Sequence, residues 1–205
     1  MYTGIVKEQL PISGILKKEG LSTFSLEFPD DLLEGLELGG SIAINGVCFT
    51  VTKISGNTVS FDAIQETLAL SNIKYLQIGS MVNVERSAKP DAEVGGHILS
   101  GHVISTAMVS HIESTENNCR LTLKGESRWL KYVFEKGFLA VNGASLTVAK
   151  LERESESFCI NLIPETLKRT NFSCLCVGDE VNIEVESQTQ VIVDTVERVM
   201  AENYQ

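Results

Sequence analysis

The stretch "KGFLAVNGASLTVAK" (136–150) closely matches an earlier stretch of the same chain, "GGSIAINGVCFTVTK" (39–53). Aligned without gaps, the two share seven of fifteen residues, and four of the remaining eight pairs exchange one apolar residue for another. A match of this length within one chain indicates an internal repeat, which has to be settled before any single strand or helix is assigned.

The match extends well beyond these fifteen residues. Gly143 follows Gly46 by 97 positions, and Gly101 follows Gly4 by the same number. Two more pairs of segments are separated by 99 positions: "ETLALSNI" (66–73) with "ETLKRTNF" (165–172), and "IGSMVNVE" (78–85) with "VGDEVNIE" (177–184). A two-residue insertion in the polar segment "LERESESF" (151–158) explains the change in spacing.

The two copies are joined by "SAKPDAEVGG" (87–96), whose proline and glycines are typical of a linker. We therefore expect an N-terminal domain over 1–97, a second domain over 98–187 and a C-terminal helix over 188–205. A chain of 205 residues is long enough for each copy to bury a core of its own.

Short runs in which apolar and polar residues alternate dominate both copies, as expected for strands with one buried face. Asn-Gly at 45–46 and at 142–143 separates two such runs, and both residue types tolerate the positive φ of a tight hairpin turn. Helical patterns are brief, at 30–36 and 127–137. Many short strands with few helices predict an all-β fold, with one small closed antiparallel barrel per copy.

The C-terminal segment has no counterpart in the first copy. Its apolar residues Ile192, Val196, Val199 and Met200 fall on one stripe of a helix. That stripe could pack on the chain's own barrel or on other subunits, and the pattern leaves both alternatives open.

The composition excludes several classes of protein. A formal charge of −10 argues against a nucleic-acid surface, because phosphate binding needs clustered lysine and arginine. The apolar runs are too short for a membrane span, and the N-terminus has no secretory signal. The five cysteines lack the paired spacing of a metal site, so we expect no metal and a cytoplasmic location.

Seven motifs, in this order along the chain, resemble the alpha-chain type of the riboflavin synthase family: "MYTGIV", "NGVCFTV", "VNVER", "GGHILSGHV", "KGFLAVNGASLTV", "LIPETLKRTN" and "TQVIVDTVERV". The resemblance implies two six-stranded Greek-key barrels that bind lumazine. It also implies a C-terminal helix that assembles a homotrimer, and it leaves open whether a lumazine synthase shell encloses the protein.

The resemblance also implies a reaction of riboflavin biosynthesis. Two molecules of 6,7-dimethyl-8-ribityllumazine react with each other, and one transfers a four-carbon unit to the other. The products are riboflavin and 5-amino-6-(D-ribitylamino)uracil, and no cofactor or metal is used. Because donor and acceptor are the same compound, a duplicated barrel would provide two similar binding sites, and the repeat would reflect the stoichiometry of the reaction.

Substrate-binding residues are implied in both copies. In the first copy they are Gly4, Ile5, Val6, Cys48, Phe49, Thr50, Asp62, Ala63, Ile64, Gln65, Glu66 and Thr67. In the second copy they are Gly101, His102, Val103, Lys136, Ser145, Leu146, Thr147, Ile163, Pro164, Glu165, Thr166, Leu167 and Lys168. Glycine in the first triplet of each copy would let the backbone approach the edge of a ring.

Three of these residues are expected to be catalytic: Cys48, His102 and Ser145. Cys48 could attack a ring carbon or hold a water there, while a small buried apolar role is the alternative. His102 suits proton removal from the 7-methyl group at neutral pH. Its alternatives are a histidine without a role and a metal ligand shared with His97, whose spacing disfavours a metal.

Glu66-Thr67 and Glu165-Thr166 could bind ribityl hydroxyls or cap the turns that follow. Lys136 has no basic equivalent in the first copy, so it could separate the donor role from the acceptor role. Glu186 stands where many relatives carry aspartate, which puts a positional role there in doubt.

A rival hypothesis is a lumazine- or flavin-binding fluorescent protein of the same fold, which would catalyse nothing. The presence of Cys48, His102, Lys136, Ser145 and Thr147 favours the enzyme. A flavin-binding reductase is disfavoured because the sequence has no glycine-rich phosphate loop after a strand.

Overall fold

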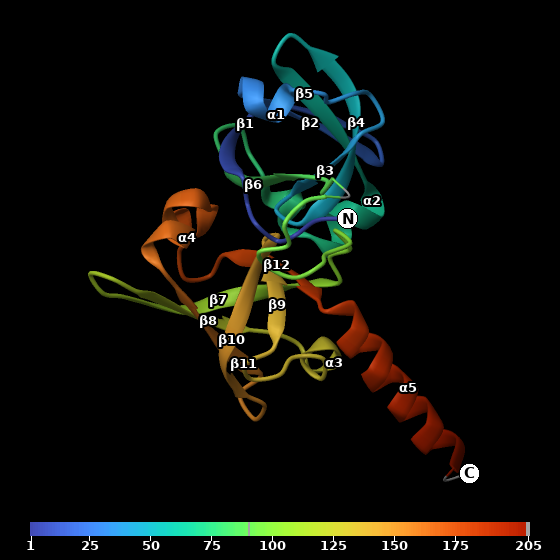
Figure 1. Ribbon diagram of the computed structural model, residues 1–205, viewed down its shortest axis with the longest axis vertical. Helices are drawn as coiled ribbons and strands as arrows, with labels where there is room; N and C mark the ends of the chain where they lie inside the picture. The colour runs from blue at the N-terminus through green and yellow to red at the C-terminus, as the bar shows by residue number, and fades with distance from the viewer. Residues whose placement is uncertain (90, 204–205) are drawn as a thin grey trace.

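The computed structural model describes residues 1–89 and 91–203 and contains two closed six-stranded antiparallel barrels (Figure 1). The first barrel consists of β1 (Glu8–Lys18), β2 (Leu21–Glu27), β3 (Ser41–Ile44), β4 (Val47–Ser55), β5 (Thr58–Ile64) and β6 (Met81–Arg86). The second consists of β7 (Ser105–Ser114), β8 (Cys119–Lys124), β9 (Phe138–Val141), β10 (Ala144–Glu152), β11 (Ser157–Leu162) and β12 (Glu180–Val185).

Both barrels have the same connectivity. The strand order β1-β2-β5-β4-β3-β6 corresponds, repeat for repeat, to β7-β8-β11-β10-β9-β12. The non-sequential pairs β2–β5 and β3–β6 are those of a Greek key. The all-β prediction of two six-stranded barrels with a C-terminal helix is confirmed.

Short helices connect the strands: α1 (Asp30–Leu33), α2 (Gln65–Leu70), α3 (Ser127–Leu130) and α4 (Pro164–Arg169), with 3-10 turns η1 (Asn72–Tyr75) and η2 (Asn171–Cys174). The helices predicted over 30–36 and 127–137 are therefore shorter than expected. In α1 only Leu32 is buried, and Gly35 at φ +65° follows its end. The sequence pattern did not reveal α2 and α4, which are too short to display a helical period.

The two Asn-Gly turns adopt the backbone that the sequence predicts. Asn45 and Asn142 have φ values of 47° and 43°, and the glycines that follow have 80° and 78°. These turns also face each other across the centre of the molecule. A Cβ atom on Gly46 would lie 2.7 Å from the backbone nitrogen of Gly143, so neither position can hold a side chain without moving the other barrel.

Buried asparagines surround the two facing turns. The side-chain oxygen of Asn142 accepts hydrogen bonds from the Asn182 backbone N–H (2.8 Å) and the Asn72 side chain (3.0 Å). The oxygen of Asn45 likewise accepts from the Asn83 backbone N–H (2.9 Å) and the Asn171 side chain (3.1 Å). In each case one of the two donors lies in the opposite barrel, so the cluster holds the barrels together. A buried polar network of this kind is stabilising because its members satisfy each other.

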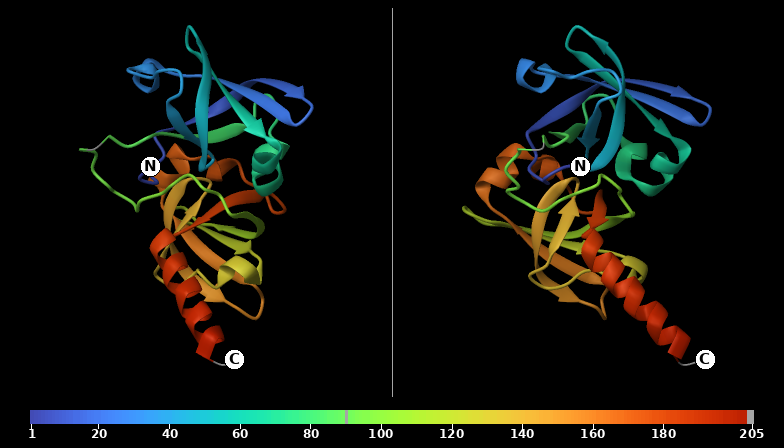
Figure 2. Two further views of the ribbon diagram at one scale, coloured as in Figure 1. Left: turned by 90° about the vertical axis from the view of Figure 1, so that its right-hand side faces the viewer. Right: turned by 45° about the vertical axis from the view of Figure 1, so that its right-hand side comes forward.

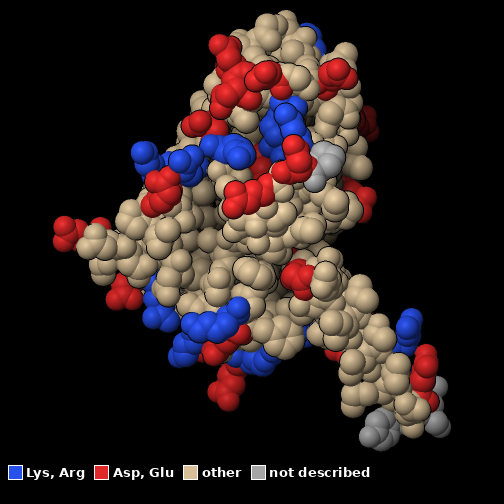
Figure 3. Space-filling view, in the orientation of Figure 1, with Lys and Arg blue, Asp and Glu red and all other residues tan. Residues whose placement is uncertain are grey.

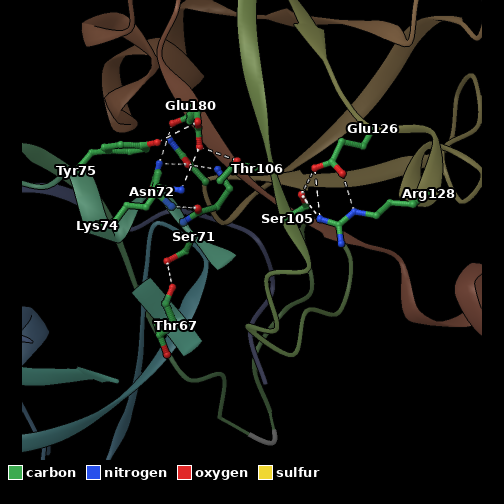
Figure 4. A network of polar contacts seen from close by, with 12 residues as sticks. Thr67, Ser71, Asn72, Lys74, Tyr75, Ser105, Thr106, Glu126, Arg128 and Glu180 are labelled. Atoms are coloured by element: carbon green, nitrogen blue, oxygen red, sulfur yellow. Dashed lines mark hydrogen bonds and ion pairs between the residues drawn. The ribbon is translucent and has the colours of Figure 1, made fainter. Parts of the chain in front are cut away.

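A second set of polar contacts continues the junction between the barrels (Figure 4). Glu180 on β12 accepts hydrogen bonds from the Tyr75 hydroxyl (3.1 Å) and the Thr106 hydroxyl (2.7 Å). Lys74 lies 3.8 Å from the same carboxylate. The turn η1 of the first barrel is thereby tied to strands β7 and β12 of the second.

Helix α5 (Ser187–Asn203) leaves the second barrel and extends beyond it (Figures 1 and 2). Its apolar side chains remain between 46% and 65% exposed: Val191, Ile192, Val196, Val199 and Met200. In Figure 3 the face of the helix turned to the viewer is mostly uncharged, and charged side chains gather near its end. The stripe that the sequence predicts is thus not covered by the chain's own barrel.

Polar contacts through Asp194 and Glu197, near the middle of α5, attach the helix to the second barrel. The Tyr132 hydroxyl donates to Asp194 at 2.6 Å, and Lys131 forms ion pairs with Asp194 and Glu197. These ion pairs raise the pKa of Lys131. Among the described residues, no helix has both the length and the apolar character needed to cross a membrane.

Candidate active site

A hollow of about 270 Å³ lies at the first barrel and contains residues from both repeats. It is lined by Val47, Cys48, Glu66, Thr67, Leu70, Ser71, Gly101, His102 and Val103. Strand β4 contributes Cys48, helix α2 contributes Glu66 and Thr67, and the remaining triplet, 101–103, belongs to the second repeat. We call this hollow the first cradle. The structure thus brings six of the predicted site residues together.

The triplet 101–103 is held against β4 by close backbone contact. The backbone N–H of Cys48 donates to the Gly101 carbonyl at 2.9 Å. Gly101 has φ +81°, and a Cβ atom there would lie 2.5 Å from the Cβ of Cys48. Only glycine permits both the backbone angle and the approach.

The reciprocal backbone contact, from the first repeat to the second barrel, occurs at Ser145. The Ser145 backbone N–H donates to the Gly4 carbonyl at 2.8 Å, and a Cβ on Gly4 would lie 2.5 Å from the Cβ of Ser145. Val6 is buried in the core of the second barrel, while Val103 packs on the core of the first. Each barrel therefore receives the first triplet of the other repeat. We call the surroundings of Ser145, with Gly4 and the segment 95–97, the second cradle.

Two buried carboxylates fix the exchanged triplets. One oxygen of Glu85 accepts from the Thr3 N–H (2.7 Å) and hydroxyl (2.8 Å), and the other accepts from the Gly4 N–H (3.1 Å). Glu184 does the same for Ser100, at 2.7 Å from both the N–H and the hydroxyl, and for Gly101 at 3.1 Å. Burial raises the pKa of Glu85, although the hydrogen bonds from Thr3 and Gly4 oppose the shift. We call these residues the carboxylate anchors.

The thiol of Cys48 is exposed in the first cradle and accepts a hydrogen bond from the Tyr2 hydroxyl at 3.1 Å. Burial raises the pKa of Tyr2, and the contact with Cys48 adds to the shift, so the phenol remains a donor at neutral pH. Thr50 lies two positions along β4 and is also exposed, as predicted. His102 is exposed at the rim, where its backbone N–H donates to the Ser100 hydroxyl at 3.2 Å.

The hydroxyl of Ser145 has a different partner. It lies 2.6 Å from Nδ1 of His97, a buried residue of the connecting segment. The sequence suggests no role for His97 other than a disfavoured metal ligand, and it gives no sign of this contact. The two cradles therefore differ at corresponding positions: a thiol beside a phenol in the first, and a hydroxyl beside an imidazole in the second.

Several predicted site residues are not part of the lining of the first cradle. Phe49 and Ala63 are buried in the first core, and the carboxylate of Asp62 accepts from the Thr23 hydroxyl at 2.6 Å on the adjacent strand. Ile64 and Ile163 are exposed at equivalent positions just before α2 and α4. The turns that follow the two Glu-Thr pairs, η1 and η2, have no side-chain cap, so the capping alternative is wrong.

The two Glu-Thr pairs also differ from each other. Glu165 is paired with Arg169 on α4, and this ion pair lowers the pKa of its carboxylate. Glu66 lines the first cradle, where Leu70 stands at the position of that arginine. Lys136 lies on the surface at φ +66° and is not part of the lining of the first cradle.

Glu186 lies directly before helix α5. Its carboxylate accepts from the Thr189 N–H (2.7 Å) and hydroxyl (2.6 Å) and from the Gln188 N–H (3.2 Å). Partial burial alone would raise the pKa of Glu186, but these hydrogen bonds lower it. The longer side chain thus still performs a local role, stabilising the start of the helix.

A larger hollow of about 790 Å³ lies between the barrels along the asparagine cluster. It contains none of the residues predicted to bind substrate. We therefore assign the candidate active site to the cradles, which contain the predicted thiol, hydroxyl and imidazole groups, and not to this larger hollow.

Comparison with known proteins identifies the family of this chain. A family model described as a lumazine binding domain matches residues 3–87 and again 100–186. The riboflavin synthase of Escherichia coli (strain K12) is 48% identical over 202 residues, which cover 98% of this chain and 94% of that protein. This chain belongs to the riboflavin synthase family. The resemblance drawn from the sequence motifs is thereby confirmed.

Other relatives support membership of the riboflavin synthase family. The riboflavin synthase of Chlamydia pneumoniae is 36% identical over 201 residues and is covered to 98% of its length. Among solved structures, LumP complexed with riboflavin has a TM-score of 0.84 at 27% identity, covering 91% of this chain and all of that one. LumP complexed with 6,7-dimethyl-8-(1'-D-ribityl) lumazine gives a TM-score of 0.82. The full-length, more similar relatives are riboflavin synthases, and they confirm the predicted activity over the binding-protein alternative.

Proposed function

We infer that the chain catalyses the dismutation of 6,7-dimethyl-8-ribityllumazine, with one substrate molecule in each of two unlike cradles. The observation that carries this proposal is the reciprocal exchange, because it builds two related binding sites that present different side chains. In the first cradle, Cys48 and His102 face the ring, and Glu66 with Thr67 binds the ribityl chain. In the second, Ser145 faces the ring. Much of the acceleration would come from holding two rings in a reactive orientation.

The proposed activity is tested by incubating the purified protein with 6,7-dimethyl-8-ribityllumazine alone. We expect one riboflavin for every two lumazines consumed, which is the stoichiometry of the proposed dismutation. Cys48→Ala should lower kcat by at least about tenfold, or ~1.4 kcal/mol of transition-state stabilisation. Cys174→Ala is the matched control, since Cys174 is also a free and exposed thiol but lies on η2. Tight binding of unchanged lumazine would refute the activity.

The two lumazine rings can react only where a first cradle faces a second cradle. We propose that a homotrimer brings the two cradles together. The uncovered stripe on α5 supports this proposal, since an exposed apolar face of this kind marks a protein contact. We expect three chains by sedimentation equilibrium, and single chains once Ile192, Val196 and Val199 are replaced by serine. A monomeric native protein that is fully active would contradict the proposal. The same measurement on material from its own cells would reveal a lumazine synthase shell.

Two further predictions remain proposals. We divide the chain into domains over 1–97 and 98–187 and a C-terminal segment over 188–205, of which 204–205 lie outside the described residues. Each of the two domains contributes a triplet to the other. We place the protein in the cytoplasm, where a reducing environment suits its five free cysteines.

A further inference from the structure

The connecting segment 95–97 passes directly over Ser145. A Cβ atom on Gly96 would lie 2.4 Å from the Thr3 carbonyl oxygen and 2.9 Å from the Ser145 hydroxyl oxygen. The backbone therefore touches the wall of the second cradle at a position that only glycine can occupy. The residue that follows, His97, enters the cradle at a fixed place.

The imidazole of His97 is held in one orientation. The ring stacks on Phe138, with ring centroids 5.1 Å apart and planes inclined by 15°. The residue is only 7% exposed, and Nδ1 lies 2.6 Å from the Ser145 hydroxyl oxygen. Among the described residues, Nε2 is buried without a hydrogen-bond partner. The contact with Ser145 is therefore the polar interaction that the structure gives this side chain.

The surroundings of His97 favour a neutral ring that can accept a proton. Burial lowers its pKa, while the charge of Glu186 opposes the shift. In the neutral tautomer that carries its proton on Nε2, Nδ1 accepts the hydrogen bond of the Ser145 hydroxyl, which leaves the lone pairs of that oxygen for a ligand. Glu186 is the charged group that acts on the ring, and its carboxylate would favour the protonated form if a proton arrived.

We propose that His97 is a positioning residue for catalysis, which orients the Ser145 hydroxyl and exchanges a proton with it while lumazine reacts in the second cradle. This inference rests on the proposed function. When a proton leaves the bound lumazine, Ser145 Oγ takes it up and passes its own hydroxyl proton to Nδ1. The return transfer restores both residues, so the pair neither gains nor loses a proton over the cycle. The relay is separate from His102, which lies in the first cradle.

Steady-state kinetics of four single variants and one double variant test the relay. His97→Phe keeps a ring on Phe138 but removes the acceptor, and we expect kcat to fall by about 100-fold with little change in KM. His97→Asn restores an acceptor at the δ position and should recover about a tenth of the wild-type kcat. In Ser145→Ala, adding His97→Phe should have no further effect. His111→Gln removes an exposed histidine on β7 and should leave kcat unchanged.

The pH profile distinguishes a proton relay from a packing role. In the wild-type protein kcat should fall as the pH drops below about 6.5, through the lowered pKa of His97, because the protonated ring cannot accept. This decrease of kcat at low pH should be absent in His97→Asn. The free energy of unfolding should also decrease at low pH. Because the folded state favours the neutral ring, the contribution of His97 to stability is lost as the pH falls through this range.

Three outcomes would overturn the relay while leaving the proposed function in place, provided that the wild-type protein forms riboflavin. They are equal kcat values for His97→Phe and the wild type, additive losses in the double variant, and a decrease of kcat at low pH that persists in His97→Asn. Circular dichroism confirms that each variant is folded. If His97→Phe does not fold, the kcat and pH profile of His97→Asn decide the question. A wild-type protein without activity would instead refute the proposed function.

Discussion

Gly143→Ala should lower the free energy of unfolding by about 3 kcal/mol, because two penalties act together. A Cβ at φ +78° is strained in the left-handed region, and it would lie 2.7 Å from the backbone nitrogen of Gly46 in the other barrel. Backbone atoms at the tip of a tight turn cannot yield as a flexible side chain does. The facing turns should separate, and the asparagine cluster around them should loosen.

Urea unfolding of this variant should be compared with that of Gly56→Ala. Gly56 also lies in a hairpin turn at positive φ (+61°), but nothing lies within 4 Å of the place where its Cβ would be. The control therefore includes the backbone strain and omits the contact between barrels, and it should lose only about 1 kcal/mol. If both variants lost the same amount, the two turns would not be what docks the barrels.

Glu184→Gln should reduce kcat/KM by on the order of a hundredfold, because it releases the triplet 101–103 from the first cradle. The carboxylate accepts hydrogen bonds from the N–H and hydroxyl of Ser100 and from the N–H of Gly101. An amide group would direct its own N–H donors at these donors. We also expect the free energy of unfolding to fall by about 2 kcal/mol, since the site is buried.

Lumazine turnover and urea unfolding measure the two effects of Glu184→Gln. The matched control is Glu27→Gln, in which an exposed carboxylate loses one hydrogen bond from the Thr58 hydroxyl. That variant should be nearly neutral in both measurements. Full activity in Glu184→Gln would mean that Gly101 alone is enough to seat the triplet, and the carboxylate anchors would then have no part in building the first cradle.

Repetition in the sequence predicted most of the architecture. Two matched copies with alternating strands and Asn-Gly turns imply two similar barrels, and both turns have the predicted backbone. The repeat also contains a signal for the buried polar residues. Asn72, Asn83 and Glu85 recur at corresponding positions of the second copy, inside segments already aligned. Buried polar residues that recur in this way are the members of the asparagine cluster and the carboxylate anchors.

The exchange of triplets could not be predicted in the same way. Sequence alignment equates Gly4 with Gly101, but it does not say whether each glycine packs on its own barrel or on the other. Which barrel each glycine packs on depends on the path of the connecting segment. The sequence of that segment shows little of the apolar–polar alternation from which a strand could be predicted. Tyr2 pairs with Leu99 in an isolated antiparallel bridge, where the two paths cross. His97 lies outside the aligned repeats, so its contact with Ser145 left no trace in the comparison of the two copies.

The exchange also limits how the two copies can evolve. After a gene duplication, one copy is ordinarily free to drift while the other keeps the original role. Here a change at Gly101 is felt at Cys48 in the other copy, and a change at Gly4 is felt at Ser145. Neither half can be deleted, exchanged between genes or inherited alone without opening a wall of its neighbour's site. The duplicated halves are thus selected as a single unit, even while their reactive side chains diverge.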